Sequence, residues 1–399
     1  MKKIAYIFYY KFNKMKYAQY GLEYLNQFLE ISVLDVSGSH EKQKIDDVYE
    51  EKINKIFFLK SAKEVRKTLI NISPDYIVLD VPESFENEIL EITRDLSFKS
   101  LKFYTSQTIN VSEGLNLIPK IKYFIQLIFI HLDLKSFFYI FFEKIKLFIF
   151  SLINIFLKKK KVFYADKFFI AGDKAMPIKF KKNEKNFEVI HVHSLDYQNT
   201  LDYKFQSKEN FNNGKNAVFL DQILLNHPDY KLVENFPCPV TNKYLHELKN
   251  FFNFIEKKFN YKIVIALHPR CNDNTLNLYE NFFKLKCFRN KSMELVSNSN
   301  IVIAHPSTTA LAYPIIFKKP LTFITTNELE KNYTKYVSFR ITNNIIKQPF
   351  VNISNKKDLE KLKDLEKIDK QGYFKYFSSY IKSHHAKNDN LWKCFLQNL

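Results

Sequence analysis

Short runs of apolar residues alternate along this chain with longer stretches in which apolar residues recur every three or four positions. The short runs have the length of buried strands, and the longer stretches have the period of amphipathic helices. The expected strands lie at 3–9, 31–36, 56–59, 75–80, 101–105, 167–172, 187–192, 217–222, 263–267, 301–304 and 320–325. The expected helices lie at 17–29, 65–70, 83–92, 244–259, 293–297, 356–368 and 373–383. Strands that alternate with helices predict parallel, doubly wound sheets.

The length and the alternation together indicate two domains. A chain of 399 residues can form a substantial core in each of them. A loop rich in lysine and asparagine interrupts the apolar pattern at 179–186, so we expect a first domain at 1–178 and a second at 179–399. The second domain is expected to end in helices. The predicted fold class is α/β, with two Rossmann-like, doubly wound domains that face a cleft.

The segment at 119–161 departs from this alternation, because phenylalanine, isoleucine and leucine dominate it. Its longest uncharged run, 147–157, is shorter than the ~20 apolar residues that a membrane-spanning helix needs. Four consecutive lysines follow at 158–161. An apolar helix closed by lysines fits an element pressed onto anionic lipid, which would give peripheral association with the inner membrane. The plainer interpretation is a buried helical hairpin between domains.

The stretch at 301–311 joins a buried strand to a helix whose start is rich in hydroxyl groups. The strand ends in His305 and a proline, and Ser307, Thr308 and Thr309 then open an apolar helical segment. The first amides of a helix lack intrahelical partners and lie at the positive end of the helix dipole, so such a terminus attracts phosphate. The plainer interpretation is that Ser307 simply caps the helix.

The same layout occurs at 262–270, where a buried strand ends in His268, a proline and Arg270. If both strands belong to one parallel sheet, we expect the two His-Pro ends to lie side by side at the edge where open α/β sheets bind ligands. A cation at one strand end and a helix start at the other suit the phosphate of a nucleotide. We assign His227, which follows another expected strand, to the same rim.

Composition narrows the class of partner. Glycine is scarce, with 6 residues, and neither GxGxxG nor GxxxxGK[ST] occurs, so helix ends and side chains must hold any phosphate. The formal net charge of +19 favours an anionic partner, although a lysine-rich surface can also be merely solvated. Neither an RNP-like run nor a Cys/His finger spacing is present, so we expect no nucleic-acid partner.

The positions of the cysteines and histidines do not predict a metal site. The four cysteines form no C-x-x-C pair, so neither a zinc site nor a disulfide framework is expected. His191 and His193 alternate on a strand beside Asp196, but no further convergent ligands can be placed. The N-terminal residues are too few and too rich in tyrosine for a signal peptide, so a reducing, cytoplasmic location is the default expectation.

Two aspartates that follow expected strands are the candidates for proton transfer. Asp221 ends one strand, and Asp196 follows another together with His193. A carboxylate at the ligand-binding edge of a sheet can accept a proton from a hydroxyl, whereas an Asp at a strand end more often caps a turn. We favour Asp221 because His227 returns to the same rim, and we keep Asp196 and His193 as alternatives.

A domain without a glycine fingerprint is followed here by an α/β domain with Leu-His-Pro-Arg at 267–270 and His-Pro-Ser-Thr-Thr at 305–309. This arrangement resembles the GT-B glycosyltransferases of bacterial surface glycans. Within them, the pairing is similar to bacterial sialyltransferases and polysialyltransferases, and also to the glycerophosphotransferases of teichoic-acid synthesis. The run 219–229 is similar to a segment of surface-carbohydrate biosynthesis proteins. The resemblance covers 185–330 by motif and the first domain by architecture only.

The resemblance implies a GT-B-like enzyme with a nucleotide donor in the second domain and the acceptor on the side of the first. His268 would lie at the donor phosphate or nucleotide, and Ser307, Thr308 and Thr309 with their amides would hold the phosphate. The motif of two acids and a glycine that supplies the base in many sialyltransferases is not visible here, so the base is sought among the strand-end aspartates.

We therefore expect a glycosyltransferase without cofactor or metal, which moves a sugar from a nucleotide-activated donor, such as a CMP-nonulosonate, onto a glycan or glycolipid acceptor of a capsule or lipopolysaccharide. A nucleotide-sugar 2-epimerase of the same architecture is one alternative, favoured by turnover of a soluble donor without acceptor. A non-catalytic nucleotide- or glycan-binding protein is the other, favoured by tight binding without turnover.

Overall fold

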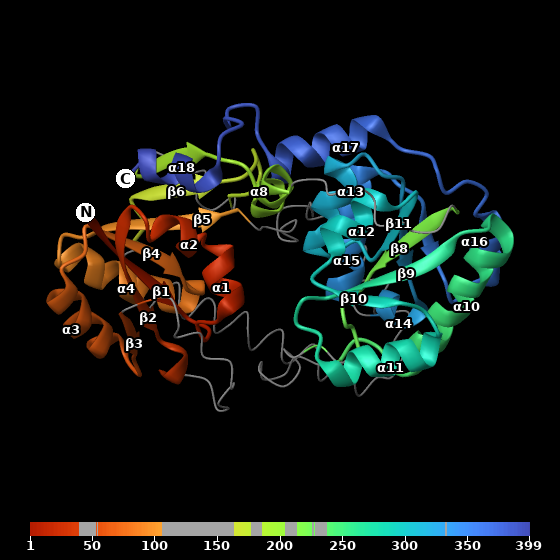
Figure 1. Cartoon of the computed structure of the whole chain (residues 1–399), viewed down its shortest axis with the longest axis horizontal. Coiled ribbons are helices and arrows are strands. Elements are labelled where there is room, and N and C mark those ends of the chain that lie inside the picture. Colours follow the sequence, from red (N-terminus) through yellow and green to blue (C-terminus); the bar gives the residue numbers. More distant parts are fainter. Residues whose placement is uncertain are drawn as a thin grey trace, which may run out of the picture.

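The computed structural model describes residues 1–39, 53, 55–105, 163–176, 186–203, 214–225, 227, 238–331 and 333–399. They form two α/β lobes, each built on one parallel sheet (Figure 1). The apolar segment at 119–161, with its lysines at 158–161, and most of the loop at 179–186 lie outside the described residues, so these expectations stay predictions. Within the described ranges, no helix combines the length and the apolar content needed to cross a membrane.

The first sheet has seven parallel strands in the order β3-β2-β1-β4-β5-β6-β7. Its strands are β1 (Lys2–Phe8), β2 (Leu29–Asp35), β3 (Ile56–Phe58), β4 (Tyr76–Asp80), β5 (Lys99–Tyr104), β6 (Lys167–Ile170) and β7 (Glu188–His191). Between the first five strands lie α1 (Lys14–Gln19), α2 (Leu22–Leu25), η1 (Ser37–Ser39), α3 (Ala62–Ile72) and α4 (Glu83–Asp95). The strands bury apolar side chains on both faces, as parallel sheets covered by helices do.

The second sheet has six parallel strands in the order β10-β9-β8-β11-β12-β13. Its strands are β8 (Asn216–Leu220), β9 (Lys262–Leu267), β10 (Cys287–Arg289), β11 (Ile301–Ala304), β12 (Leu321–Thr325) and β13 (Phe350–Asn352). Its helices are α10 (Lys243–Phe259), α11 (Asp273–Phe283), α12 (Ser292–Asn298), the 3-10 turn η4 (Thr309–Leu311), α13 (Ala312–Ile316), α14 (Asn327–Lys331), α15 (Tyr333–Ile346) and α16 (Lys356–Lys361).

The two sheets share one strand order. If the strands of each sheet are numbered along the chain, the first six lie in the order 3-2-1-4-5-6 in both lobes. This is the order of a doubly wound, Rossmann-like sheet, and it confirms the predicted fold class. The order reverses between β1 and β4 in the first sheet and between β8 and β11 in the second. Ligands of such sheets bind outside the carboxyl ends of the strands at this reversal.

Local sequence signals fix where several helices begin and end. Ser61 caps α3, because its hydroxyl accepts a hydrogen bond of 3.3 Å from the N–H of Glu64, whose carboxylate accepts one of 2.8 Å from the N–H of Lys60. At the other end of a helix, Asn260 adopts a φ of 58° and closes α10 in the left-handed conformation that asparagine tolerates.

The single helix expected at 17–29 is wrong, because the chain forms two short helices there, α1 and α2, and β2 already begins at Leu29. Gly21 separates the two helices with a φ of 57°, a conformation that glycine adopts readily. A Cβ at this position would also overlap the ring of Trp392. The break therefore makes room for a side chain from the far end of the sequence.

The C-terminal part of the chain crosses from the second lobe back to the first. Helix α17 (Lys370–Tyr376) packs on the core of the second lobe, the π-helical turn η5 (Phe377–Ile381) follows, and α18 (Leu391–Gln397) packs on the core of the first. In the crossing, the N–H groups of Asp173 and Lys174 donate to the carbonyls of Ser378 and Ser379 at 3.0 and 2.9 Å. Figure 1 shows this blue segment passing between the lobes.

The domain boundary expected at 178/179 does not match the sheet pairing. Strand β7 pairs in parallel with β6, with His191 opposite Ile170, and so belongs to the first sheet. Helix α18 also belongs with this sheet, since Trp392 and Phe395 are buried in its core. A charged loop interrupts the apolar pattern but does not end a sheet, because strand pairing is decided by tertiary contacts. The first lobe thus takes residues from both sides of the expected boundary.

Candidate active site

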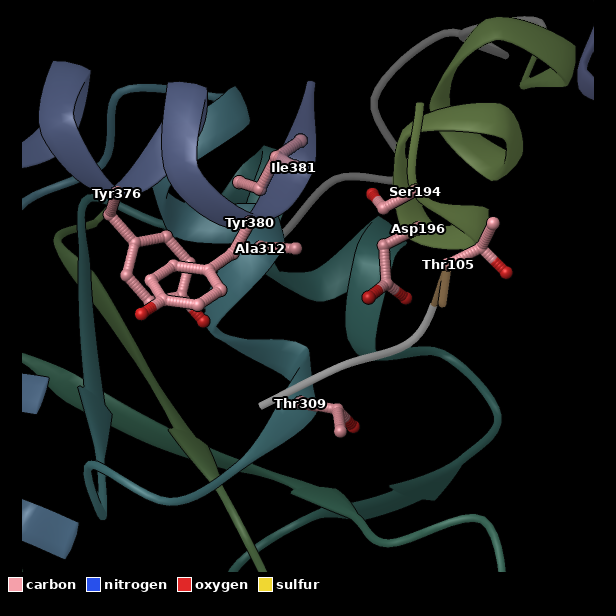
Figure 2. A pocket seen from close by; sticks show the side chains of 8 residues that line it. All are labelled: Thr105, Ser194, Asp196, Thr309, Ala312, Tyr376, Tyr380 and Ile381. Atoms are coloured by element: carbon pink, nitrogen blue, oxygen red, sulfur yellow. The ribbon is translucent and has the colours of Figure 1, made fainter. Parts of the chain in front are cut away.

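A small pocket lies between the two lobes (Figure 2). It is lined by Thr105, Ser194, Asp196, Thr309, Ala312, Tyr376, Tyr380 and Ile381. Thr105 follows β5 and Ser194 follows β7 of the first sheet, whereas Thr309 follows β11 of the second. The two tyrosines and Ile381 belong to α17 and η5 of the crossing segment. The pocket therefore lies where the carboxyl edges of both sheets, the edges that bind ligands, face each other.

Helix α8 (Leu195–Asp202) carries Asp196 into this pocket in its first turn. Ser194 caps the helix, because its hydroxyl accepts a hydrogen bond of 3.2 Å from the N–H of Tyr197. The N–H of Ser194 donates to the carbonyl of Ile381 at 2.7 Å, and the N–H of Leu195 donates to that of Thr105 at 3.0 Å. These bonds fix the first turn of α8, and the Asp196 carboxylate is directed into the pocket (Figure 2).

Asp196 is the carboxylate of the pocket lining. Burial raises the pKa of Asp196 to about 6, and a hydrogen bond from the Tyr313 hydroxyl opposes that shift. The lining contains no lysine, arginine or histidine, so no cation among these residues offsets the lost hydration of the charged form. A carboxylate with this pKa is mostly ionised at neutral pH and is a good proton acceptor.

The helix after β11 begins later than expected. Thr308 caps η4, because its hydroxyl accepts a hydrogen bond of 3.3 Å from the N–H of Ala310, and Thr309 is the first residue of the turn. The α-helix proper, α13, starts only at Ala312. Pro314 consequently lies in the first turn of α13, where an N–H has no intrahelical partner to lose.

The three hydroxyl groups expected to hold a phosphate have different positions. Thr309 is exposed and lines the pocket, whereas Thr308 is buried and caps the turn. Ser307 is half-buried, and its Oγ donates a hydrogen bond of 3.1 Å to Oε1 of Gln222. Gln222 follows β8, so this bond crosses the point where the strand order of the second sheet reverses.

The two His-Pro strand ends do belong to one parallel sheet, but they are not neighbours. Strand β8 lies between β9, which precedes His268, and β11, which precedes His305. Adjacent strands are ~4.8 Å apart, so the two ends are separated by roughly 10 Å across the sheet. Sequence reasoning could not see this, because β8 precedes both strands in the chain yet is inserted between them in space.

His268 and His227, which we expected at the same rim of the sheet, lie close together. Their ring centroids lie 5.3 Å apart at an interplanar angle of 66°. Nδ1 of His268 accepts a hydrogen bond of 3.2 Å from the N–H of Arg270, so the neutral ring carries its proton on Nε2. Both His268 and His227 are half-buried, and Arg270 is exposed. This group forms a basic rim at the carboxyl end of β9.

His305 lies in the core of the second lobe instead of at its rim. Its side chain has no solvent exposure, and its ring stacks on Phe339. Nδ1 makes a hydrogen bond of 2.9 Å with the carbonyl of Ile324, and Nε2 makes one of 2.8 Å with the hydroxyl of Tyr244. Because side chains alternate between the faces of a strand, His305 continues the inward face of Ile303. The structure thus gives this expected phosphate ligand two protein partners.

Asp221 is also turned inward and is not among the residues that line the pocket. Its side chain is 3% exposed, and the hydroxyl of Tyr279 donates to Oδ1 at 3.5 Å. Within the described residues, Oδ2 has no hydrogen-bond partner. Burial raises the pKa of Asp221 to about 7. Hydrogen bonds from the N–H groups of Ile223 and Gln222 oppose this shift, because they stabilise the charged form. A carboxyl group placed in this way is partly protonated at neutral pH.

His193 anchors the crossing segment. Its side chain is 1% exposed, and Nε2 makes a hydrogen bond of 2.8 Å with the carbonyl of Asp389. Its backbone forms an isolated antiparallel bridge with Lys382. The neighbouring His191 makes a hydrogen bond of 3.2 Å between Nδ1 and Oγ of Ser383. Of the three candidates for proton transfer, the structure thus brings Asp196 into the pocket, but not Asp221 or His193.

Sequence reasoning missed several residues of the site. Thr105 stands at the end of the strand expected at 101–105, so its position was a usable signal. Tyr376 and Tyr380 lie in the helix expected at 373–383, and nothing in the sequence indicated that this helix reaches the site. Tyr313, which hydrogen-bonds to Asp196, stands within an apolar segment and looked like a core residue. In the part of the chain that the structure describes, no group of three or more His, Cys, Asp or Glu side chains converges on a metal position.

Known proteins resemble this chain in structure but not in sequence. No family model matches the chain, and no curated protein matches it. The glycotransferase of kitacinnamycin has a similar structure, with a TM-score of 0.54 and 8% identity over 100% of this chain and 98% of that chain. MurG of Acinetobacter baumannii has a TM-score of 0.49 and 9% identity over 100% of both chains. The UDP-GlcNAc 2-epimerase of Neisseria meningitidis, bound to UDP-GlcNAc, has a TM-score of 0.47 and 12% identity over 100% of both chains.

At 8% identity, the similarity to the glycotransferase of kitacinnamycin establishes the fold alone. With its sheets of seven and six parallel strands in two Rossmann-like domains, the chain has the GT-B architecture.

Proposed function

We propose that this protein is a glycosyltransferase that moves a sugar from a nucleotide-activated donor to a glycan acceptor. The observation that carries the proposal is the Asp196 carboxylate, which has a pKa near neutrality and lines a pocket between two doubly wound domains. The donor nucleotide binds at the carboxyl edge of the second sheet, and the acceptor enters from the side of the first. The two domains proposed here are the lobes built on the first and second sheets.

Asp196 serves as the base in this scheme. The acceptor hydroxyl oxygen forms a bond to the anomeric carbon of the donor sugar, and the bond from that carbon to the donor phosphate oxygen breaks. The hydroxyl proton passes to the Asp196 carboxylate, whose pKa of about 6 keeps it ionised at neutral pH and close enough to neutrality to accept the proton. Asp221 and His193 are less suited, because 3% and 1% exposure leave little access for an acceptor.

The second sheet supplies groups for the leaving phosphate. Negative charge develops on the phosphate as the sugar departs, and fixed donors at that position stabilise it. Thr309 lines the pocket with its hydroxyl group, and Ser307 lies at the strand reversal. The basic rim of His268, His227 and Arg270 lies roughly 10 Å further across the sheet, a distance that a nucleotide spans. This scheme needs no metal.

The finer identity of the substrates follows from the sequence resemblance. A CMP-nonulosonate is the donor that we would test first, since the His-Pro and Ser/Thr-rich motifs resemble those of sialyltransferases. The acceptor would be a capsule or lipopolysaccharide glycan at the cytoplasmic face of the inner membrane, where the lysines at 158–161 would favour anionic lipid. The structural similarity to the glycotransferase of kitacinnamycin supports a transferase of this architecture.

A nucleotide-sugar 2-epimerase is the second candidate function. The observation that favours it is the small pocket, whose lining combines one carboxylate with the phenols of Tyr376 and Tyr380. Epimerisation needs a proton to be removed from one face of a sugar carbon and returned on the other, and it needs no room for a glycan. Conversion of a nucleotide sugar into its epimer without any acceptor, followed by NMR, would favour this function over transfer.

The test begins with the donor. Thermal unfolding is measured with CMP, UDP, GDP and CDP, because a ligand that binds the native state raises its stability by mass action. The sugar donors of the stabilising nucleotide are then incubated with the protein, with and without glycan acceptors. Asp196→Asn should lower transfer roughly 10²–10⁴-fold while leaving nucleotide affinity nearly unchanged. Absence of stabilisation by every nucleotide, or full turnover by Asp196→Asn, would refute the proposal.

A further inference from the structure

Asp196 and Tyr313 are held by different lobes and meet beside the pocket. The helix that carries Asp196 is tied to the first lobe, since the N–H of Leu391 in α18 donates to Oε1 of Gln198 at 2.7 Å. Tyr313 belongs to α13, whose side chains Ala312 and Ile315 are buried in the core of the second lobe. A contact between these two residues therefore bridges the lobes at the candidate site.

The Tyr313 hydroxyl uses both of its hydrogen-bonding capacities on α8. It donates to the Asp196 carboxylate and accepts from Nδ2 of Asn199 at 3.4 Å. Asp196 and Asn199 are three positions apart on one helix, so their side chains share a face. The Tyr313 phenol thus contacts this face from the second lobe, on whose core Tyr197 of α8 also packs.

Among the residues that the structure describes, the titratable groups that face Asp196 from the surrounding elements are phenols. They are Tyr313 of α13, Tyr376 of α17 and Tyr380 of η5. The Tyr376 pKa is raised chiefly by burial and also by the negative charge of Asp196. Among these three, Tyr313 is the one that hydrogen-bonds to the carboxylate. It is therefore the group that can select one orientation of the Asp196 side chain.

We propose that Tyr313 is a positioning residue, supplied by the second lobe, that orients the Asp196 carboxylate of the first lobe for proton transfer. The inference rests on the proposed function, since it assigns Asp196 the role of base. The base is then complete only when the lobes are together, because its hydrogen-bond donor belongs to the opposite lobe. Proton transfer is thereby tied to the arrangement of the lobes in which α8 contacts α13.

The test variant is Tyr313→Phe, which keeps the buried ring and removes only the hydroxyl. Its matched control is Tyr373→Phe, which removes another buried hydroxyl from the same core, one that donates to the carbonyl of Lys319 at 2.6 Å and does not line the pocket. Tyr313→Phe loses the phenol's bonds to Asp196 and Asn199, and Tyr373→Phe loses the phenol's bond to Lys319, so a general loss of stability should appear in both. An effect on Asp196 should appear only in the first.

The direct readout is the titration of the Asp196 carboxyl carbon by ¹³C NMR, with the signal identified by its absence in Asp196→Asn. Losing a donor to the charged form should raise the pKa of Asp196 by roughly half to one unit in Tyr313→Phe. Tyr373→Phe should titrate like wild type. An unchanged titration in Tyr313→Phe would overturn the inference, as would an equal shift in the control.

Kinetics separate this inference from the proposed function. The acidic limb of the pH profile of kcat should move to higher pH in Tyr313→Phe by the same amount, with KM for the donor unchanged. If NMR shows the shift but no transfer is found with any donor, the contact stands and the proposed function fails. If wild type transfers sugar and Tyr313→Phe keeps its titration and its pH profile, the inference fails and the proposed function stands.

Discussion

The hydroxyl of Ser307 donates a hydrogen bond of 3.1 Å to Oε1 of Gln222. These residues follow β11 and β8, the two strands between which the order of the second sheet reverses. The bond therefore spans the reversal of strand order, outside which a doubly wound sheet binds its ligand. A phosphate bound at the start of η4 would lie beside this hydroxyl, which could then turn from Gln222 to the ligand.

Ser307→Ala should weaken nucleotide binding. Loss of a hydrogen bond to a charged phosphate costs about 1.5–3 kcal/mol, which corresponds to a roughly ten- to hundredfold higher Kd. The measurement is isothermal titration calorimetry with the nucleotide that stabilises the protein. The matched control is Ser297→Ala, which removes a hydroxyl that donates to the carbonyl of Glu294 within α12. Equal Kd values for the two variants would remove Ser307 from the donor site.

The two histidines that follow β9 and β11 should respond in opposite ways to alanine. His268→Ala should raise the nucleotide Kd with little change in the unfolding temperature, because this half-buried ring lies at the rim. His305→Ala should lower the free energy of unfolding by about 2–5 kcal/mol, since it leaves a cavity and unpaired groups in the core. Calorimetry and denaturant unfolding distinguish the two. A stable His305→Ala protein with lost nucleotide affinity would contradict the core assignment.

The free energy of unfolding should fall as the pH rises, because Asp221 loses its proton. Its folded-state pKa of about 7 lies above the value of an unfolded chain, so the folded protein retains a proton that the unfolded chain releases. The stability that this proton contributes is complete below about pH 4 and is lost progressively up to about pH 7, by roughly 4 kcal/mol at most. Asp221→Asn should therefore match wild type at pH 4 and exceed it at pH 8 in urea unfolding. A constant difference between the two proteins would show that Asp221 does not titrate in this way.

Wild-type turnover should rise with pH through about pH 6, because the base must be ionised and the pKa of Asp196 is raised to about 6. Asp196→Asn should lose this limb together with most of its activity. Asp221→Asn should keep both the limb and its midpoint, since Asp221 does not line the pocket. A profile of kcat/KM against pH for the three proteins is decisive. Loss of the limb in Asp221→Asn would return the role of base to that residue.

Gly172→Ala should loosen the crossing between the lobes. A Cβ on Gly172 would overlap the backbone of Ser379, so β6 and η5 would have to move apart. Overpacking of this kind costs about 1–3 kcal/mol. Thermal unfolding should show a lower midpoint for Gly172→Ala than for Gly38→Ala, where the nearest atom would lie 3.6 Å from the added Cβ. Equal midpoints would mean that the crossing adjusts without strain.

Much of the fold could be predicted because it follows from local pattern. The runs at 217–222, 263–267, 301–304 and 320–325 became β8, β9, β11 and β12 within a few residues. Strands of this kind are apolar on both faces, so their burial shows in the sequence. The prediction of one helix at 17–29 was wrong because the break at Gly21 depends on Trp392. This residue is remote in sequence, and its ring fills the space beside Gly21.

The candidate site could be predicted only in part. The alternation of strand and helix placed Asp196, Thr309 and His268 at strand ends, and the rim of His227 and His268 followed from that. Strand-end position does not tell which way a side chain turns. Asp221 and His305 turn into the core, where Tyr279 and Tyr244 meet them. Which polar residue is a ligand group and which is a core group depends on these contacts.

The sequence by itself determined the class of the fold, because the period of apolar residues selects strand or helix locally and alternation selects parallel sheets. It also determined that any phosphate would be held without a glycine loop. Only the tertiary structure decided that β7 joins the first sheet, that β8 lies between the two His-Pro ends, and that Asp196 meets Tyr313 from the other lobe. These relationships join residues far apart in the chain, so they depend on how whole elements pack, which no local pattern specifies.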